Sequence, residues 1–234
     1  MDYRIFPPEE LPEAIIDLPL SKSISNRVLI INALAGGAGV VTRVAKCDDT
    51  DVMLVALGSS DDTVSIGAAG TAMRFLTAYF AATPGRTVTL DGSERMRRRP
   101  IAPLVDALRM CGAHIEYTGE EGYPPLRIEG ITLAGGEIEL DGGVSSQFVS
   151  ALLMVAPTMS GGLKLHIKGD VVSQPYISMT LGIMAEWGVE AQREGNVITV
   201  PHASYTPVAY AVEADWSAAS YWYELQSFSF GTIG

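Results

Sequence analysis

One order of elements occurs twice in this chain of 234 residues, first from Gly70 and again 75 positions later, from Ser145. In each copy two small residues open an apolar helix and an alternating strand follows. A second helix then begins at an X-Pro step and ends at a glycine before another strand. A shorter copy begins at Ser21-Lys22-Ser23, and the N-cap cluster Asp48-Asp49-Thr50 announces its second helix. The sequence therefore predicts three βαβαββ-like units in one α/β domain.

Three predicted helices, at 28–35, 72–82 and 147–156, are apolar nearly all the way round, which places them inside the domain. In three repeated units they run parallel, with their N-termini at one end. The full set of predicted helices is 25–35, 49–57, 71–82, 101–111, 146–156 and 176–187. The predicted strands are 87–91, 126–129, 137–141, 163–168 and 197–200, with further strands near 113–117 and 189–192.

Aligned helix N-termini present free N–H groups and positive dipole ends, and both favour a bound anion. The loops that open the three inner helices carry small, hydroxyl and amide side chains: Ser21, Lys22, Ser23, Gly70, Thr71, Ser145, Ser146 and Gln147. In any one loop these residue types are more often simple helix caps. Three such loops in one repeat register favour a phosphate or carboxylate ligand.

The cations of the chain gather near the same loops. Four of the 16 basic residues lie within 95–99, directly before Pro100. A run of arginines is usually a solvated loop, but this one sits at a strand-to-helix joint, so we expect at least one arginine to point at the face where the helices open. Lys22, Arg27 and Arg74 add cations at the starts of the other two helices. The pattern predicts a small ligand with several negative charges.

Composition excludes several classes of protein. A net charge of −11 argues against a general nucleic-acid binder, and 47% hydrophobic residues are enough to close a core. Two distant cysteines form no metal or disulfide pattern, and the acidic N-terminal sequence lacks a signal-peptide core. No stretch is long enough to span a membrane, and His114, His166 and His202 are too scattered to form a site. We expect a cytoplasmic protein with no membrane or nucleic-acid partner.

Five motifs together resemble the 5-enolpyruvylshikimate-3-phosphate synthase family. They are 20–27 (LSKSISNR), 67–75 (GAAGTAMRF), 91–101 (DGSERMRRRPI), 145–148 (SSQF) and 172–177 (VSQPYI). The resemblance implies an enolpyruvyl-transferase fold, an inside-out α/β barrel of three βαβαββ repeats around buried parallel helices. It also implies transfer of the enolpyruvyl group of phosphoenolpyruvate to the 5-hydroxyl of shikimate 3-phosphate, with release of phosphate.

The resemblance also assigns roles residue by residue. Shikimate 3-phosphate would be bound by Lys22, Ser23, Arg27, Ser145, Ser146, Gln147, Ser173 and Tyr176. Phosphoenolpyruvate would be bound by Lys22, Gly70, Arg99 and Gln147, with Lys22 as the catalytic residue, a proton donor or electrostatic stabiliser. The family needs no metal or organic cofactor. Its herbicide ligand glyphosate would compete with phosphoenolpyruvate.

The chain departs from the family in two ways. Ala68 and Gln174 stand where the family often has Asn and Lys, which implies altered affinity rather than lost activity. Members of the family are about twice as long, and their second domain supplies the acid/base carboxylate. We therefore expect residues 21–213 to form one substrate-binding domain. Residues 1–20 and 214–234 would be fragments of the second domain, either disordered or paired with another copy of the chain.

Two alternatives remain open. The sister family acts on a UDP-amino sugar and usually carries a reactive cysteine before the Arg-Pro step, whereas residues 91–100 contain none and Cys111 lies a helix later. From a different class, the chain could be a non-catalytic binding or regulatory module that kept the substrate pocket.

Overall fold

The computed structural model of the chain describes residues 4, 6, 15–171 and 173–228. Its helices are α1 (Lys22–Leu34), α2 (Asp48–Gly58), α3 (Gly70–Ala81), α4 (Glu94–Arg97), α5 (Ala102–Met110), α6 (Ser146–Val155), the 3₁₀ turn η1 (Ala156–Thr158), α7 (Gln174–Glu186) and α8 (Trp216–Ser227). Its strands are β1 (Val40–Thr42), β2 (Thr63–Ser65), β3 (Thr87–Asp91), β4 (His114–Tyr117), β5 (Leu126–Glu129), β6 (Gly136–Asp141), β7 (Leu163–Lys168), β8 (Gln192–Glu194), β9 (Val197–Val200) and β10 (Ala209–Ala211).

Two four-stranded sheets share one topology, with strand orders β2-β3-β5-β4 and β6-β7-β9-β8. In each sheet the first two strands run parallel and the other pairs are antiparallel. The parallel strands are connected through α3 in one sheet and through α6 in the other, and α5 and α7 follow at equivalent places. The two longer copies of the predicted repeat are therefore complete βαβαββ units.

The shorter copy is assembled from both ends of the sequence. Its strand β1 pairs in parallel with β10, so that Val40 lies opposite Ala209 and Thr42 opposite Ala211. β10 takes the place beside its parallel partner that β2 and β6 hold in the other units, although it is the last strand in the sequence. Within the described residues this unit has only a two-stranded sheet, with α1 and α2 as its helices.

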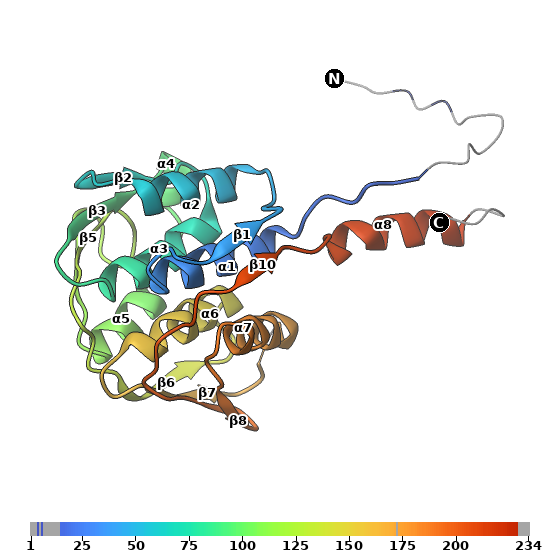
Figure 1. Ribbon diagram of the computed structural model, residues 1–234. Helices are drawn as coiled ribbons and strands as arrows, with labels where there is room; N and C mark the ends of the chain where they lie inside the picture. The colour runs from blue at the N-terminus through green and yellow to red at the C-terminus, as the bar shows by residue number, and fades with distance from the viewer. Residues whose placement is uncertain (1–3, 5, 7–14, 172, 229–234) are drawn as a thin grey trace.

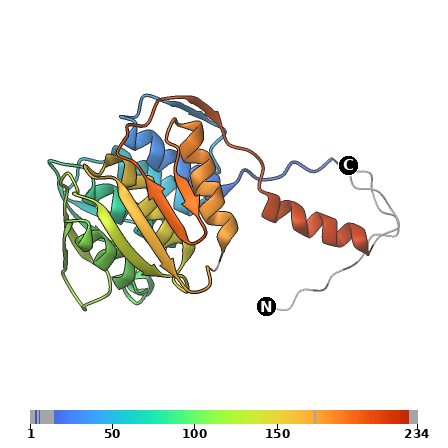
Figure 2. The same cartoon turned by 90° about the horizontal axis from the view of Figure 1, so that it is seen from below.

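The helices α1, α3 and α6 pack against one another in the middle of the molecule. Side chains such as Val28, Phe75 and Leu152 are fully buried there, which explains why these helices have no polar face. The sheets lie outside them, each with one buried face, as the alternating burial along β7 shows (Figures 1 and 2). The predicted arrangement of sheets around buried helices is confirmed.

The chain leaves this body at one place. Leu20 and Ala214 form an antiparallel bridge, flanked by hydrogen bonds from Ser21 N–H to Glu213 O (2.9 Å) and from Asp215 N–H to Pro19 O (2.8 Å). Beyond it α8 extends away from the body, on the same side as residues 15–19 (Figure 1). The division into a domain at 21–213 and two fragments stays a prediction, and residues 1–3, 5, 7–14 and 229–234 of these ends lie outside the described residues.

The six predicted helices are present to within a few residues, whereas α4, α8, β1, β2 and β10 are missing from the prediction. One local prediction is wrong. The N-cap of α2 is Cys47, which makes no side-chain capping bond, and Asp48 and Asp49 lie inside the first turn. Their negative charges still interact favourably with the positive end of the α2 dipole, but the carboxylate of Asp49 contacts α1 and α3.

Candidate functional site

A cavity of about 350 Å³ opens where the three inner helices begin. It is lined by Lys22, Ser23, Arg27, Thr71, Ser145, Ser146, Gln147, Tyr176 and Asp215. Seven of these are predicted binding residues, contributed by the first two turns of α1, the first turns of α6 and α7 and the loop before α6. The geometry explains their types, because free N–H groups and positive helix ends meet at this cavity.

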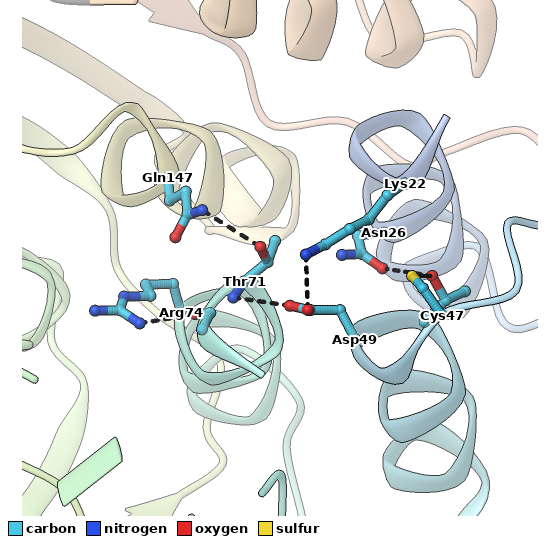
Figure 3. A network of polar contacts seen from close by, with 9 residues as sticks. Lys22, Asn26, Cys47, Asp49, Thr71, Arg74 and Gln147 are labelled. Carbon is cyan, nitrogen blue, oxygen red and sulfur yellow. Dashed lines mark hydrogen bonds and ion pairs between the residues drawn. The ribbon is translucent and has the colours of Figure 1, made fainter. Parts of the chain in front are cut away.

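Four helices are tied together at the floor of this site (Figure 3). The Lys22 ammonium lies 2.7 Å from the carboxylate of Asp49, which also accepts a hydrogen bond of 3.2 Å from the Thr71 N–H. The Gln147 amide in turn donates to the Thr71 hydroxyl at 3.3 Å. Asp49 is missing from the predicted site. The only signal for it is the Asp-Asp pair at the start of α2, in the same repeat unit as Lys22.

Lys22 is held loosely. Its side chain is 45% exposed, so its ion pair with Asp49 is worth at most about 1 kcal/mol. An incoming phosphate or carboxylate can therefore compete with Asp49 for the ammonium group.

Arg27, in contrast to Lys22, is buried and firmly held. It is 2% exposed, and its guanidinium donates to Thr180 Oγ1, Ser150 Oγ and Ser23 O at 2.7, 3.0 and 2.8 Å. It also lies 5.4 Å from the ring centroid of Phe75 and 5.8 Å from that of Tyr176. Burial lowers the pKa of Arg27 to about 10, so the side chain stays charged at neutral pH.

The arginine cluster separates into paired and unpaired members. Arg97 pairs with Asp91 and Arg98 with Glu94 on the exposed surface. Arg95 and Arg99 have no acidic partner among the described residues, and they line a second cavity of about 170 Å³ with Ala68 and Met96. The prediction that at least one arginine faces the helix openings is confirmed. The Arg99 guanidinium lies against Gly70 at the start of α3, so close that a Cβ added to Gly70 would stand only 2.2 Å from Arg99 Nη1.

Arg74 adds a second buried cation behind Arg99. It is 5% exposed and donates to Gly70 O at 2.9 Å, while its Nε finds no acceptor among the described residues. Burial, and then the positive charge of Arg99, lower the pKa of Arg74 to about 10. Two neighbouring cations without an acid between them indicate a site for an anion.

The remaining predicted residues are placed less directly. Arg99 lines the smaller cavity rather than the larger one. Gly70 lines neither, but it lies directly against the Arg99 guanidinium. Ser173 lines neither; it is exposed and precedes α7 in the left-handed conformation, with φ of 63°. Ser21 and Ser145 act as ordinary caps, because their hydroxyls accept from Ile24 N–H at 3.4 Å and from Gln147 N–H at 3.3 Å.

Residues 57–233 match the sequence profile of a family described as EPSP synthase (3-phosphoshikimate 1-carboxyvinyltransferase). The chain belongs to this family. It is 51% identical over 230 residues to the 3-phosphoshikimate 1-carboxyvinyltransferase of Bacteroides fragilis, covering 98% of this chain and 56% of the relative. It is 42% identical to the enzyme of that name from Tolumonas auensis, covering 89% of this chain and 56% of the relative.

An EPSP synthase structure from Acinetobacter baumannii has the same fold, with a TM-score of 0.76 and 23% identity over 89% of this chain and 52% of that one. The chain spans about half the length of the curated relatives that it matches. No helix in the described part of the chain is long and apolar enough to cross a membrane. The same residues contain no group of three or more His, Cys, Asp or Glu side chains arranged to hold a metal.

Cys111, the residue relevant to the UDP-amino-sugar alternative, is fully buried at the C-terminal end of α5 and lines neither cavity. Burial raises the pKa of its thiol from 9.0 to about 11. The thiolate is the reactive form of cysteine, and at pH 8 this shift cuts the thiolate fraction roughly a hundredfold. Cys111 is therefore not built as a nucleophile.

This makes a prediction for thiol labelling. In a Cys47→Ser variant, where Cys111 is the only thiol, a disulfide reagent at pH 8 should react at once with the unfolded chain and hardly at all with the folded chain. Labelling of the folded chain should accelerate as the pH approaches 11. The Cys111→Ser variant is the control, since its half-buried Cys47 should be labelled faster. Equal rates for folded and unfolded Cys111 would contradict its assigned environment.

Proposed function

We propose that this chain is the substrate-binding half of an EPSP synthase. It would bind shikimate 3-phosphate and phosphoenolpyruvate for transfer of the enolpyruvyl group to the 5-hydroxyl, with release of phosphate. The observation that carries the proposal is the cavity of cations, hydroxyls and helix N-termini, with a second cationic cavity beside it. Each substrate carries one carboxylate and one phosphate, and such ligands need several fixed donors.

The larger cavity suits shikimate 3-phosphate. Ser145, Ser146 and Gln147 open α6 and can donate hydroxyl, amide and backbone N–H groups to a phosphate. Arg27 supplies a fixed positive charge, and the half-exposed ring of Tyr176 offers a flat wall for the carbocycle. Ser23 completes this side. Ser173 would need to turn toward the cavity to take part.

The smaller cavity suits phosphoenolpyruvate. Arg99 and Arg95 line it, and Arg74 lies behind them with an unsatisfied Nε. Ala68 also lines this cavity, so the place of the family's frequent Asn offers no polar group here. Lys22 and Gln147 lie at the larger cavity and would reach the same substrate from that side.

Lys22 is the residue to which we assign the chemistry within this half. Its exposed ammonium can leave Asp49 and approach the double bond of phosphoenolpyruvate, where it can donate a proton to the methylene carbon or stabilise charge as the 5-hydroxyl adds to the neighbouring carbon. The partner acid or base would come from the second half of the whole protein.

The main test measures binding and turnover separately. The 234-residue chain should bind shikimate 3-phosphate weakly by calorimetry and release negligible phosphate when phosphoenolpyruvate is added. Lys22→Met should weaken binding about tenfold or more, the loss of one charge-assisted contact. Lys164→Met removes the same charge from an exposed surface pair with Glu137 and should leave binding unchanged.

Each other outcome has a distinct meaning. Full turnover by a monomer would contradict the assignment of acid/base chemistry to a second half. Tighter binding of a UDP-amino sugar would favour the sister family. Absence of any binding would overturn the proposal, whereas binding with no turnover even after a complementary second half is supplied would favour the non-catalytic module.

A second test uses the contact between Gly70 and Arg99. A Cβ at position 70 displaces the end of the arginine side chain rather than backbone, so Gly70→Ala should fold normally and move the cation. With shikimate 3-phosphate saturating, it should weaken phosphoenolpyruvate binding several-fold. Glyphosate, which we propose competes for the same site, should be weakened with it. Gly58→Ala meets no atom within 4 Å and is the control; equal effects of the two variants would contradict this placement.

We also propose that the chain associates with a second copy through its ends. Along α8 and at its C-cap, large apolar side chains are exposed: Trp216, Tyr221, Tyr223, Leu225 and Phe228. Sedimentation should show dimers at concentrations near 100 µM, roughly the range where weak association is populated. Tyr221→Ser with Tyr223→Ser should abolish them, while Val55→Ser, an equally exposed site on α2, should not. A monomer throughout would contradict this proposal.

A further inference from the structure

The surroundings of Arg27 are unusual for a buried cation. In the described part of the chain it has no carboxylate partner, although a buried charge is costly unless it is paired and hydrogen-bonded. Its contacts are instead neutral: two side-chain hydroxyls, one backbone carbonyl and two aromatic rings. The charge of Arg27 is therefore held in position without being neutralised.

The two hydroxyls come from different helices. Thr180 lies in α7 and Ser150 in α6, while Arg27 itself lies in α1. Thr180 Oγ1 accepts from Arg27 Nε at 2.7 Å, Ser150 Oγ accepts from Nη2 at 3.0 Å, and the two oxygens lie 2.9 Å apart. They occupy the side of the guanidinium that a carboxylate binds in a bidentate pair, with oxygen acceptors but without its negative charge.

A count of the donors shows what remains for a ligand. A guanidinium has five N–H groups. Three are used by Thr180, Ser150 and Ser23, so one N–H on each terminal nitrogen has no acceptor among the described residues. Arg27 also contributes to the lining of the larger cavity.

We propose that Thr180 and Ser150 are positioning residues, which hold the Arg27 guanidinium on one side so that its remaining N–H groups and its full charge face an anionic ligand in the cavity. This inference rests on the proposed function for the identity of that ligand, shikimate 3-phosphate. Neither residue lines the cavity, so both act through Arg27.

Thr180 can do this without losing its own hydrogen bond. Its hydroxyl accepts from Arg27 while its single proton can go to Tyr176 O at 2.8 Å, one turn back in α7. Tyr176 lies at the cavity and its ring contacts Arg27. The same hydroxyl therefore links the cation to the helix turn that carries the aromatic wall.

The chain contains a matched control in α3. Thr77 is equally buried and donates to Met73 O one turn back at 2.7 Å, but no side chain among the described residues donates to it. Thr77→Val and Thr180→Val remove the same hydroxyl from the same kind of buried helix position. Only Thr180→Val removes an acceptor from an arginine. Thr180→Ser keeps that acceptor and loses only a methyl group.

The experiment has two readouts on the full chain, calorimetric affinity for shikimate 3-phosphate and hydrogen exchange of the Arg27 Nε–H, assigned with Arg27→Lys. Thr180→Val should weaken affinity about tenfold and accelerate exchange of the Nε–H at least as much. Thr180→Ser and Thr77→Val should stay close to wild type in both. Ser150→Ala, which replaces the residue by a good helix former, should weaken affinity without exposing the Nε–H, and it serves if Thr180→Val fails to fold.

The outcomes separate this inference from the proposed function. If the wild-type chain does not bind shikimate 3-phosphate but Thr180→Val still accelerates Nε–H exchange, the proposed ligand is wrong and the positioning contact stands. If Thr180→Val leaves the exchange rate unchanged, or if Thr77→Val changes affinity as much as Thr180→Val does, the positioning role is overturned.

Discussion

The rest of the structure depends on mutual burial of three helices. Because α1, α3 and α6 are apolar on nearly every side, they can be buried only against one another, and the sheets must cover them from outside. Repetition of one βαβαββ unit then orients these helices alike, since each enters its unit in the same way. Their N-termini meet at one end as a consequence of packing, before any ligand is considered. The site is therefore a property of the fold as much as of its individual residues.

The distribution of charged side chains agrees with a binding site at the end where the inner helices begin. The chain has a net charge of −11, yet at the end where the inner helices open Arg27, Arg74, Arg95 and Arg99 have no carboxylate partner among the described residues. The outer strands show the contrary pattern, where Lys164 pairs with Glu137 and Arg127 with Glu116. Such surface pairs contribute little stability. Arg27, Arg95 and Arg99 line the two cavities where the proposed ligands, each with a carboxylate and a phosphate, would meet them.

Much of this could be predicted from sequence because it is periodic or local. The repeat, the apolar helices and the arginine at the Arg-Pro step are visible as patterns, and so are the hydroxyl loops. The pairing of β1 with β10 could not be predicted, since it joins three-residue strands from opposite ends of the sequence. Asp49 is an acidic residue of a kind common at helix starts, so its sequence context does not mark it as part of the site. Only the tertiary structure brings its carboxylate to Lys22 and α3. Thr180 and Ser150 look like ordinary residues of helix interiors, and nothing in their neighbours marks a partner 153 or 123 positions away.

The contrast between Lys22 and Arg27 follows from burial. An exposed ammonium can be paired with Asp49 at little cost, because water screens the pair and an anionic ligand can replace the carboxylate. A carboxylate beside the buried guanidinium would be hard to displace, because both charges would lie in a medium of low dielectric constant. Hydroxyls resolve this conflict: they satisfy the donors of Arg27 but leave its charge available. A site that must bind anions reversibly can thus keep a carboxylate at its exposed cation, while its buried cation needs neutral acceptors.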